Sequence, residues 1–155
     1  MFKLRRIQQT TRIAAALLLA GALTSCSKDI AYDYTPSGVV AQVDAIKLTV
    51  GTQTVTIFKD GKVTLGPLSF VRPSTTITAA LLDAQGNALT GLNENDIRVN
   101  MGIESGASGT YTRINGFSGT LSATTAGSSS FAVSLFDGAK HRIAFGPYYV
   151  AIVIR

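Results

Sequence analysis

The feature that most constrains the fold is an alternation of apolar and polar residues with a period of two. Ile46, Leu48 and Val50 alternate with Lys47 and Thr49. The same pattern recurs at residues 55–57, 77–81, 97–101, 131–135 and 148–154. Alternation of this kind, rich in Val, Ile and Thr, is typical of strands with one buried face. Since no long stretch after residue 26 keeps a helical period, we expect no substantial helix there.

Short turn signals separate these runs. Asp60-Gly61 and Asp137-Gly138 each lie between two strand-like segments, and Gly86-Asn87 interrupts the chain in a similar way. Asp-Gly suits a two-residue type I′ turn, in which both central residues need a positive φ. Many short strands with regular turns indicate an all-β fold. We therefore predict an antiparallel β-sandwich of about seven to nine strands over residues 43–155.

Residues 1–25 have the features of an export signal. Lys3, Arg5, Arg6 and Arg12 form a basic start, and residues 13–23 are uncharged and mostly aliphatic. A helix needs about 20 apolar residues to cross a bilayer core, so this block is too short to span. We expect a signal helix that is cleaved from the mature protein.

The end of this signal, Leu23-Thr24-Ser25-Cys26, resembles the lipobox of bacterial lipoproteins. The resemblance implies cleavage before Cys26, a diacylglycerol on its sulfur and a further acyl chain on its amino group. Several acyl chains together anchor a protein stably in a membrane. In this family an Asp after the cysteine retains the protein at the inner membrane. Ser27 stands there instead, which implies the outer membrane of the bacterial cell envelope.

The segment from Cys26 to residue 42 is predicted to be a flexible lipidated tether. It has no sustained period and carries Pro36 and Gly38 near its end. The twelve residues from Ser27 to Gly38 reach about 40 Å when fully extended. Such a tether is long enough to hold the domain away from the bilayer.

The net charge of +5 belongs mainly to the signal. Four of the fourteen basic residues lie within it, which leaves ten against nine acidic residues. The mature chain is therefore nearly neutral and has no cluster of Lys and Arg, which argues against nucleic-acid binding. Cys26 is the only cysteine, so once it is lipidated no disulfide is available to the domain.

Two segments, residues 78–91 and 116–133, resemble bacterial Ig-like domains. In the first, a strand leads into Asp83-Ala84-Gln85-Gly86-Asn87; in the second, a Gly-bounded strand, a small-residue turn and an apolar strand follow one another. The resemblance implies a non-catalytic β-sandwich of the cell envelope. It carries over no catalytic or binding residue.

Catalytic candidates are few. His141, the only histidine, lies between Lys140 and Arg142 and is expected to be a solvated strand residue. No nucleophile pattern accompanies it, since the segment from Gly106 to Gly109 is better explained as a flexible loop. We therefore expect a protein that is not an enzyme and needs no cofactor.

Metal candidates are equally few. Buried zinc or copper sites need three or four suitable ligands, and the mature chain offers only His141 and Met101. The loop Asn93-Glu94-Asn95-Asp96 has the oxygen atoms that calcium prefers. The same residue types also form ordinary turns, and the spacing of a calcium-binding loop is missing. We expect a turn there and no metal.

These observations leave two hypotheses for the domain. The first is a membrane-anchored envelope lipoprotein with a binding or structural module, whose partners are the membrane and either envelope proteins or glycans. The second is a carrier with a ligand pocket inside the sandwich. Of the adjacent Tyr148 and Tyr149, one is expected to face solvent. The segments Gly102–Gly109 and Ser128–Ser130 are predicted to be loops, where sandwich domains tend to bind.

Overall fold

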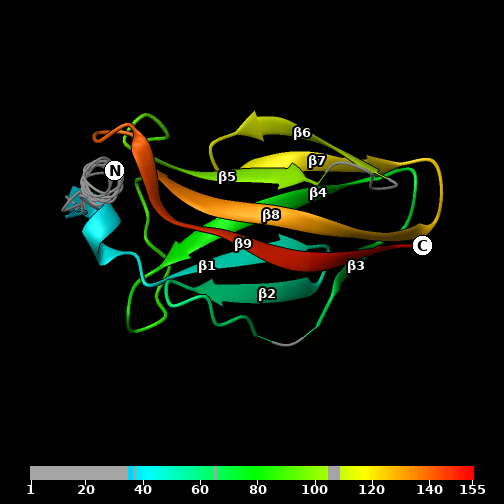
Figure 1. Ribbon diagram of the computed structural model, residues 1–155, viewed down its shortest axis with the longest axis horizontal. Helices are drawn as coiled ribbons and strands as arrows, with labels where there is room; N and C mark the ends of the chain where they lie inside the picture. The colour runs from blue at the N-terminus through cyan, green and yellow to red at the C-terminus, as the bar shows by residue number, and fades with distance from the viewer. Residues whose placement is uncertain (1–34, 37, 65, 105–108) are drawn as a thin grey trace, which may run out of the picture. The chain divides into compact units, whose positions relative to one another are not determined.

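Two facing β-sheets make up the described part of the chain (Figure 1). The computed structural model describes residues 35–36, 38–64, 66–104 and 109–155. In these residues a short 3-10 helix precedes nine strands. The elements are η1 (Gly38–Gln42), β1 (Ala45–Val50), β2 (Gln53–Phe58), β3 (Leu68–Phe70), β4 (Ser74–Leu82), β5 (Ile97–Ile103), β6 (Gly109–Asn115), β7 (Ser118–Ala123), β8 (Gly127–Asp137) and β9 (Arg142–Ile154).

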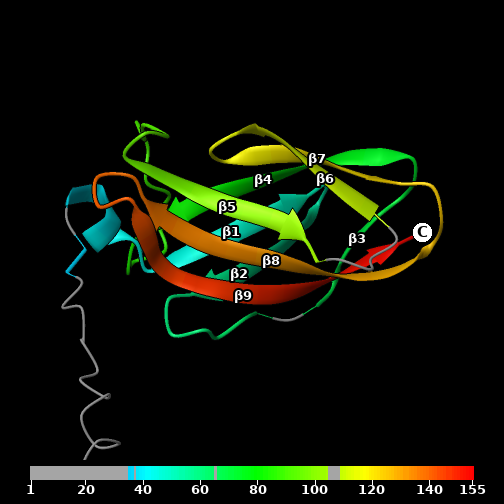
Figure 2. The same ribbon diagram turned by 45° about the horizontal axis from the view of Figure 1, so that its top comes forward.

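The strand order is that of an Ig-like sandwich. One sheet has the order β2-β1-β4-β7-β6 and the other β3-β9-β8-β5. Within them, β1-β4-β7-β6 corresponds to the A, B, E and D strands of an immunoglobulin domain, and β5-β8-β9 to C, F and G. In Figure 2 the sheet with β5, β8 and β9 lies in front of the sheet with β1 and β4. The predicted Ig-like fold class is confirmed.

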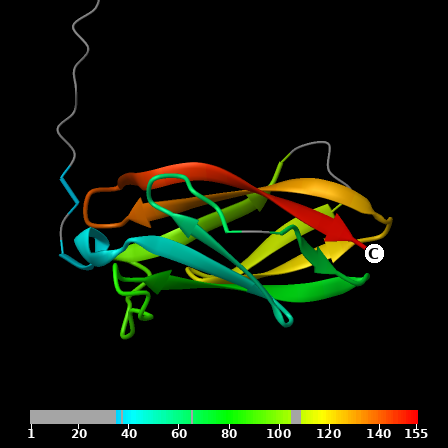
Figure 3. The same ribbon diagram turned by 90° about the horizontal axis from the view of Figure 1, so that it is seen from below.

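One pair of strands departs from the antiparallel prediction. β3 pairs with β9 in parallel, with Leu68 opposite Ile152 and Phe70 opposite Ile154. β2 returns antiparallel to β1, so the chain comes back to the η1 end before it enters β3 (Figure 3). Since β9 also starts at that end, the two strands run in the same direction. β2 therefore lies between β1 and β3 in the sequence, and β1 and β3 belong to different sheets.

The core lies between the sheets and follows the predicted alternation. Ile46, Leu48 and Ile57 of the first sheet are completely buried, as are Phe131 and Leu135 of the second. The apolar members of the other predicted runs are also buried or half-buried, Met101 and Tyr148 belonging to the latter group. Burial of a Leu, Ile or Phe side chain contributes about 1.5–3 kcal/mol. This continuous cluster holds the fold together without a disulfide.

The Asp60-Gly61 turn is not of the predicted two-residue type. The Phe58 N–H donates to Lys62 O (2.8 Å) and the Gly61 N–H donates to Phe58 O (2.9 Å). Three residues therefore form the loop, and Gly61 has a φ of 85°. A type I′ turn would also need a positive φ at Asp60. The loop instead has the form of a type I turn followed by a left-handed glycine, another common hairpin connection.

The Asp137-Gly138 prediction was also wrong in its turn type. Asp137 pairs with Arg142, so residues 138–141 form a four-residue connection. His141, with a φ of 50°, occupies its last position and is exposed; it is a turn residue and not the predicted strand residue. Four-residue loops built around a type I turn are a known alternative. This longer loop allows Gly138 to reach the opposite loop at Asp96.

The tether prediction extends too far toward the domain. Residues 38–42 form η1, and Val40 of this helix is buried in the core together with Val43. The Val43 N–H donates to Val40 O (3.2 Å), which closes the short helix onto β1. The packed unit thus begins before the predicted boundary at residue 43, because apolar residues on both sides of Ala41 reach the core. Residues 26–34 lie outside the described residues.

The loop prediction for Ser128–Ser130 is wrong, because these residues belong to β8. Ser128 pairs with Val153, and Ser130 pairs with Ala151. The serine run is extended because β9 supplies backbone partners along its whole length. Gly102 belongs to β5, and residues 105–108 of the other predicted loop lie outside the described residues. In the part of the chain that is described, no helix has the length and apolar character needed to cross a membrane.

Candidate functional site

The predicted lipidation site, Cys26, lies outside the described residues, as does the predicted signal at residues 1–25. The structure therefore leaves the anchor as a prediction. It does place η1 at one end of the sandwich, opposite the end of β9 (Figure 3). The chain that follows Cys26 enters the packed unit at this η1 end.

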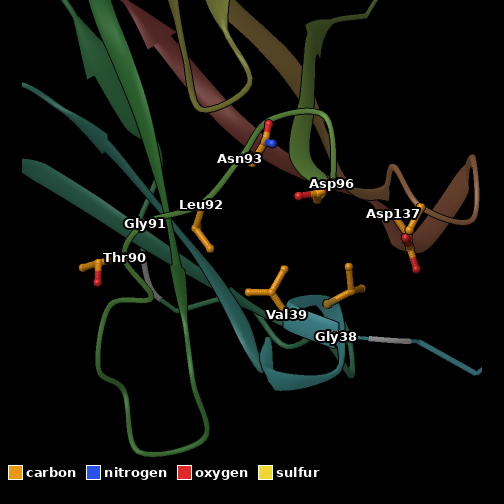
Figure 4. Close-up of a pocket in the computed structure, with 10 residues that line it drawn as sticks. Gly38, Val39, Thr90, Gly91, Leu92, Asn93, Asp96 and Asp137 are labelled. Atoms are coloured by element: carbon orange, nitrogen blue, oxygen red, sulfur yellow. The ribbon is translucent and has the colours of Figure 1, made fainter.

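A pocket of about 370 Å³ lies at the η1 end of the sandwich (Figure 4). Its walls come from η1, from the loop at residues 90–96 and from the β8–β9 connection. Val39 and Leu92 extend toward each other across it (Figure 4), and both are half-buried. These two apolar residues give the pocket wall an apolar part between η1 and the loop.

The polar side of this pocket is held by intramolecular bonds. Asp137 is completely buried, and its Oδ1 accepts a hydrogen bond from the Lys140 N–H (3.1 Å). The Gly138 N–H donates to Asp96 O (2.7 Å). Since buried carboxylates need such partners, Asp137 here stabilises the β8–β9 turn. These bonds hold the β8–β9 turn against the loop at residues 93–96.

The loop considered for calcium forms a turn that its own side chains stabilise. Asn93 Oδ1 accepts a hydrogen bond from the Asn95 N–H (3.0 Å), which is the side-chain-to-backbone bond typical of Asx turns. Glu94 Oε2 accepts from the Gly116 N–H and pairs with Arg113 at 3.3 Å. Among the described residues, no group of three His, Cys, Asp or Glu side chains is placed to hold a metal ion.

The segment at residues 83–87, part of the Ig-like resemblance, forms a tight turn around one carboxylate. Asp83 Oδ1 accepts hydrogen bonds from the Asn87 N–H (2.8 Å) and the Gln85 N–H (2.9 Å). The Asn87 backbone bond, followed by the smaller contributions of the other turn donors, lowers the pKa of Asp83 below its ordinary 3.8. This carboxylate stabilises a turn and is not poised for proton transfer at neutral pH.

The tyrosine prediction is confirmed. Tyr149 faces solvent and is 55% exposed, whereas Tyr148 is half-buried and its hydroxyl donates to Lys59 O (2.6 Å). Tyr111 lies edge-on to Phe131, with ring centroids 5.6 Å apart. Two of these three rings therefore pack against the domain, and Tyr149 stands apart from them on the outer face of the second sheet.

The interior separates the two functional hypotheses. A carrier needs a cavity between the sheets, but the inward side chains of both sheets form one apolar cluster there. Four hollows of about 280 to 420 Å³ that the described residues line lie at the two ends of the sandwich. The described part of the domain thus has a filled apolar core.

No protein-family model and no curated protein matches the chain. One solved structure, the crystal structure of the S-layer protein SbsC domains 4 and 5, is similar to it with a TM-score of 0.39 and 13% sequence identity. The likeness covers 77% of this chain and 81% of that one. The strand order described above, and not this likeness, identifies the fold as Ig-like.

Sequence reasoning missed two features of the domain. Ser129 is 8% exposed, and its hydroxyl has no hydrogen-bond partner among the described residues. Gly138 approaches Asn95 so closely that a Cβ at position 138 would overlap the Asn95 carbonyl. A serine run and an Asp-Gly pair give no local signal of either feature, because both depend on which strand or loop lies opposite.

Proposed function

We propose that this protein is a lipid-anchored lipoprotein of the bacterial cell envelope, most consistent with the outer membrane, whose Ig-like sandwich is a non-catalytic binding or structural module. The observation that carries the proposal for the domain is its filled interior, with Ile46, Leu48 and Phe131 completely buried between the sheets. The lipobox resemblance at residues 23–26 supports the anchor.

The position of η1 agrees with such an anchor. Ser27 to Gly38 is a stretch of twelve residues, so the η1 end stays within about 40 Å of the bilayer however the segment is arranged. The opposite end carries the β1–β2 turn and the end of β9 (Figure 1). A lipid at Cys26 would therefore leave the long faces of both sheets accessible to partners in the envelope.

The arrangement of polar groups supports a module without catalysis. His141 lies in an exposed turn, and Asp137 accepts a hydrogen bond from the backbone of that turn. A general base must be within hydrogen-bond reach of the proton that it removes. The carboxylates described above are instead bonded to backbone N–H groups, which suits a structural role.

Membrane fractionation of cells that produce the full chain tests the anchor. Wild-type protein should be found in the outer-membrane fraction and should incorporate labelled fatty acid. Cys26→Ala should remove the label and release the protein, because the sulfur that carries the diacylglycerol is absent. Ser27→Asp is the matched control: it keeps the acylation site and should move the protein toward the inner membrane.

Two results would contradict this proposal. A Cys26→Ala protein that stays with the membrane would show that something other than the lipid holds it there. An intact, unacylated N-terminus in mass spectra of protein from bacterial cells would exclude processing at Cys26.

A further inference from the structure

A regular grid of hydroxyl groups covers part of the outer face of the five-stranded sheet. It is formed by six residues on three neighbouring strands, two each from β4, β7 and β6. In one row Thr76 is opposite Thr120, which is opposite Thr112; in the next row Ser74 is opposite Ser122, which is opposite Thr110. Ile77, Leu121 and Tyr111, which alternate with these residues, point inward to the core. We call these six residues the hydroxyl grid.

The spacing of the grid follows from strand geometry. Neighbouring strands lie about 4.8 Å apart, and residues two positions apart along a strand are separated by about 6.7 Å. A third row continues the pattern across the sheet, with Thr54 opposite Thr49, Thr49 opposite Thr78, and Thr78 opposite Ser118. The hydroxyl groups therefore repeat at fixed distances in two directions.

The grid is uncharged and its hydroxyls are not engaged. No position of the three rows holds a charged residue, although charged residues usually make up roughly a quarter to a third of a soluble surface. No side-chain hydrogen bond among the described residues uses a hydroxyl of the grid. By contrast, the hydroxyl of Thr64, which is outside the grid, is bonded to the backbone of Thr56. These hydroxyls can therefore both donate and accept hydrogen bonds to a ligand.

A hollow lies at one end of the grid. It has a volume of about 420 Å³, and Ser74, Thr110 and Ser122 of the grid form part of its wall. Thr124, in the turn between β7 and β8, adds a fourth hydroxyl-bearing residue to the wall. This volume is within the range of small-ligand sites. The grid thus leads into a recess with four hydroxyl-bearing residues in its wall, beside Pro73, Gly109 and Ala123.

The chemistry of this surface selects one class of ligand. A charged ligand finds no opposite charge on the grid, whereas each sugar hydroxyl needs a partner that can donate or accept. Threonine methyl groups between the hydroxyls offer small apolar contacts to the C–H groups of a sugar ring. Because threonine is stiff at χ1, ordering the grid on binding costs little conformational entropy.

We propose that the hydroxyl grid and its hollow form a binding site for uncharged glycans. The site deepens the proposed function, because it assigns the binding role of the module to one face of the five-stranded sheet. A glycan chain lies along the rows and places one sugar unit in the hollow between Ser74 and Thr110. The grid rests on β4, β7 and β6, whose positions are fixed by the core beneath them.

Calorimetric titration of the full chain with soluble oligosaccharides of dextran, mannan and laminarin tests the site. Cys26→Ala is included in every sample so that binding is measured without an anchor. At least one of these neutral probes should bind, and hyaluronate oligosaccharides, which carry carboxylates, should bind more weakly. Replacing both Thr76 and Thr120 with Val keeps the β-branched shape and removes two hydroxyls. The affinity should fall about tenfold, as expected when two hydrogen bonds are lost.

Two controls complete the experiment. Thr120→Ser keeps the hydroxyl and should retain affinity within about twofold, less than the loss of one hydrogen bond. Ser130→Val changes an exposed residue on the other sheet and should have no effect. The proposal is overturned if none of the neutral probes binds, if hyaluronate binds more tightly, or if the Thr→Val pair behaves like Ser130→Val. Because the titration uses unanchored protein, these results are independent of membrane fractionation.

Discussion

Replacement of Gly138 by Ala should destabilise the domain strongly, although the glycine has no positive φ that requires it. A Cβ at position 138 would overlap the Asn95 carbonyl group. The Gly138 N–H also donates to Asp96 O at 2.7 Å, so the β8–β9 turn and the loop at residues 93–96 are in direct backbone contact. An added methyl group must push these two segments apart.

The magnitude follows from two contributions. Overpacking at a close contact typically costs about 1–3 kcal/mol, and loss of the Gly138–Asp96 hydrogen bond adds about 1 kcal/mol. The free energy of unfolding should therefore fall by about 2–4 kcal/mol. For a domain of this size about 1 kcal/mol corresponds to about 4 °C in Tm, so Tm should drop by about 8–16 °C.

Urea unfolding followed by far-UV circular dichroism measures this change. Gly102→Ala is the matched control, because a Cβ at position 102 meets no atom within 4 Å. A strand glycine is about 0.5–1 kcal/mol less favourable than alanine, so this control should be neutral or slightly stabilising. If Gly138→Ala unfolds within about 0.5 kcal/mol of the wild type, the usual range for surface changes, the close contact with Asn95 does not hold the turn.

Two further substitutions test a buried hydroxyl group and a half-buried tyrosine. Ser129→Ala removes a buried hydroxyl without a partner and should raise the free energy of unfolding by about 1 kcal/mol; lower stability in urea unfolding would mean that the hydroxyl has a partner. Burial raises the pKa of Tyr111 above its ordinary 10.0, against the opposing effect of Arg113. The stability that this shift contributes is complete below pH 10 and is lost as the pH rises through the raised pKa. Tyr111→Phe should therefore lose less stability than the wild type between neutral pH and pH above 10, as measured by unfolding midpoints, and an identical decline in both would refute the assignment.

The strands could be predicted because each carries its own signal. Val55 and Ile57, for example, are apolar positions that alternate with threonines, and they are buried in the first sheet. The Ig-like resemblance of residues 78–91 and 116–133 predicted the fold class, but the strand order was not predicted and came from the structure. Periodicity shows which face of a strand is buried, but it does not show which strand lies beside it.

The errors share one physical cause, which is contact between segments distant in sequence. Ser128–Ser130 were predicted to be a loop because small polar residues favour turns, yet β9 holds them extended. In the four-residue loop at 138–141, the Gly138 N–H donates to Asp96 O of a loop distant in sequence. Local residue types cannot reveal either partner.

Little of the candidate site could be predicted from the sequence. That His141 and the loop at 93–96 are not chemical centres stays a prediction. The hydroxyl grid could not be found in the same way, because Ser74, Thr112 and Ser122 become neighbours only through the register of three strands. A threonine in an isolated strand pattern indicates only a solvent-facing position.

The parallel pairing of β3 with β9 bears on how the domain responds to tension. β9 ends at Ile154, at the opposite end of the sandwich from η1 (Figure 3), and Phe70 of β3 lies beside it. A pull between η1 and Ile154 runs along the strands, so it loads in shear the hydrogen bonds that join β9 to β3 and to β8. Bonds loaded in this way must break together instead of unzipping one after another. A domain that is tethered at η1 and held at the far end of β9 should therefore resist mechanical unfolding.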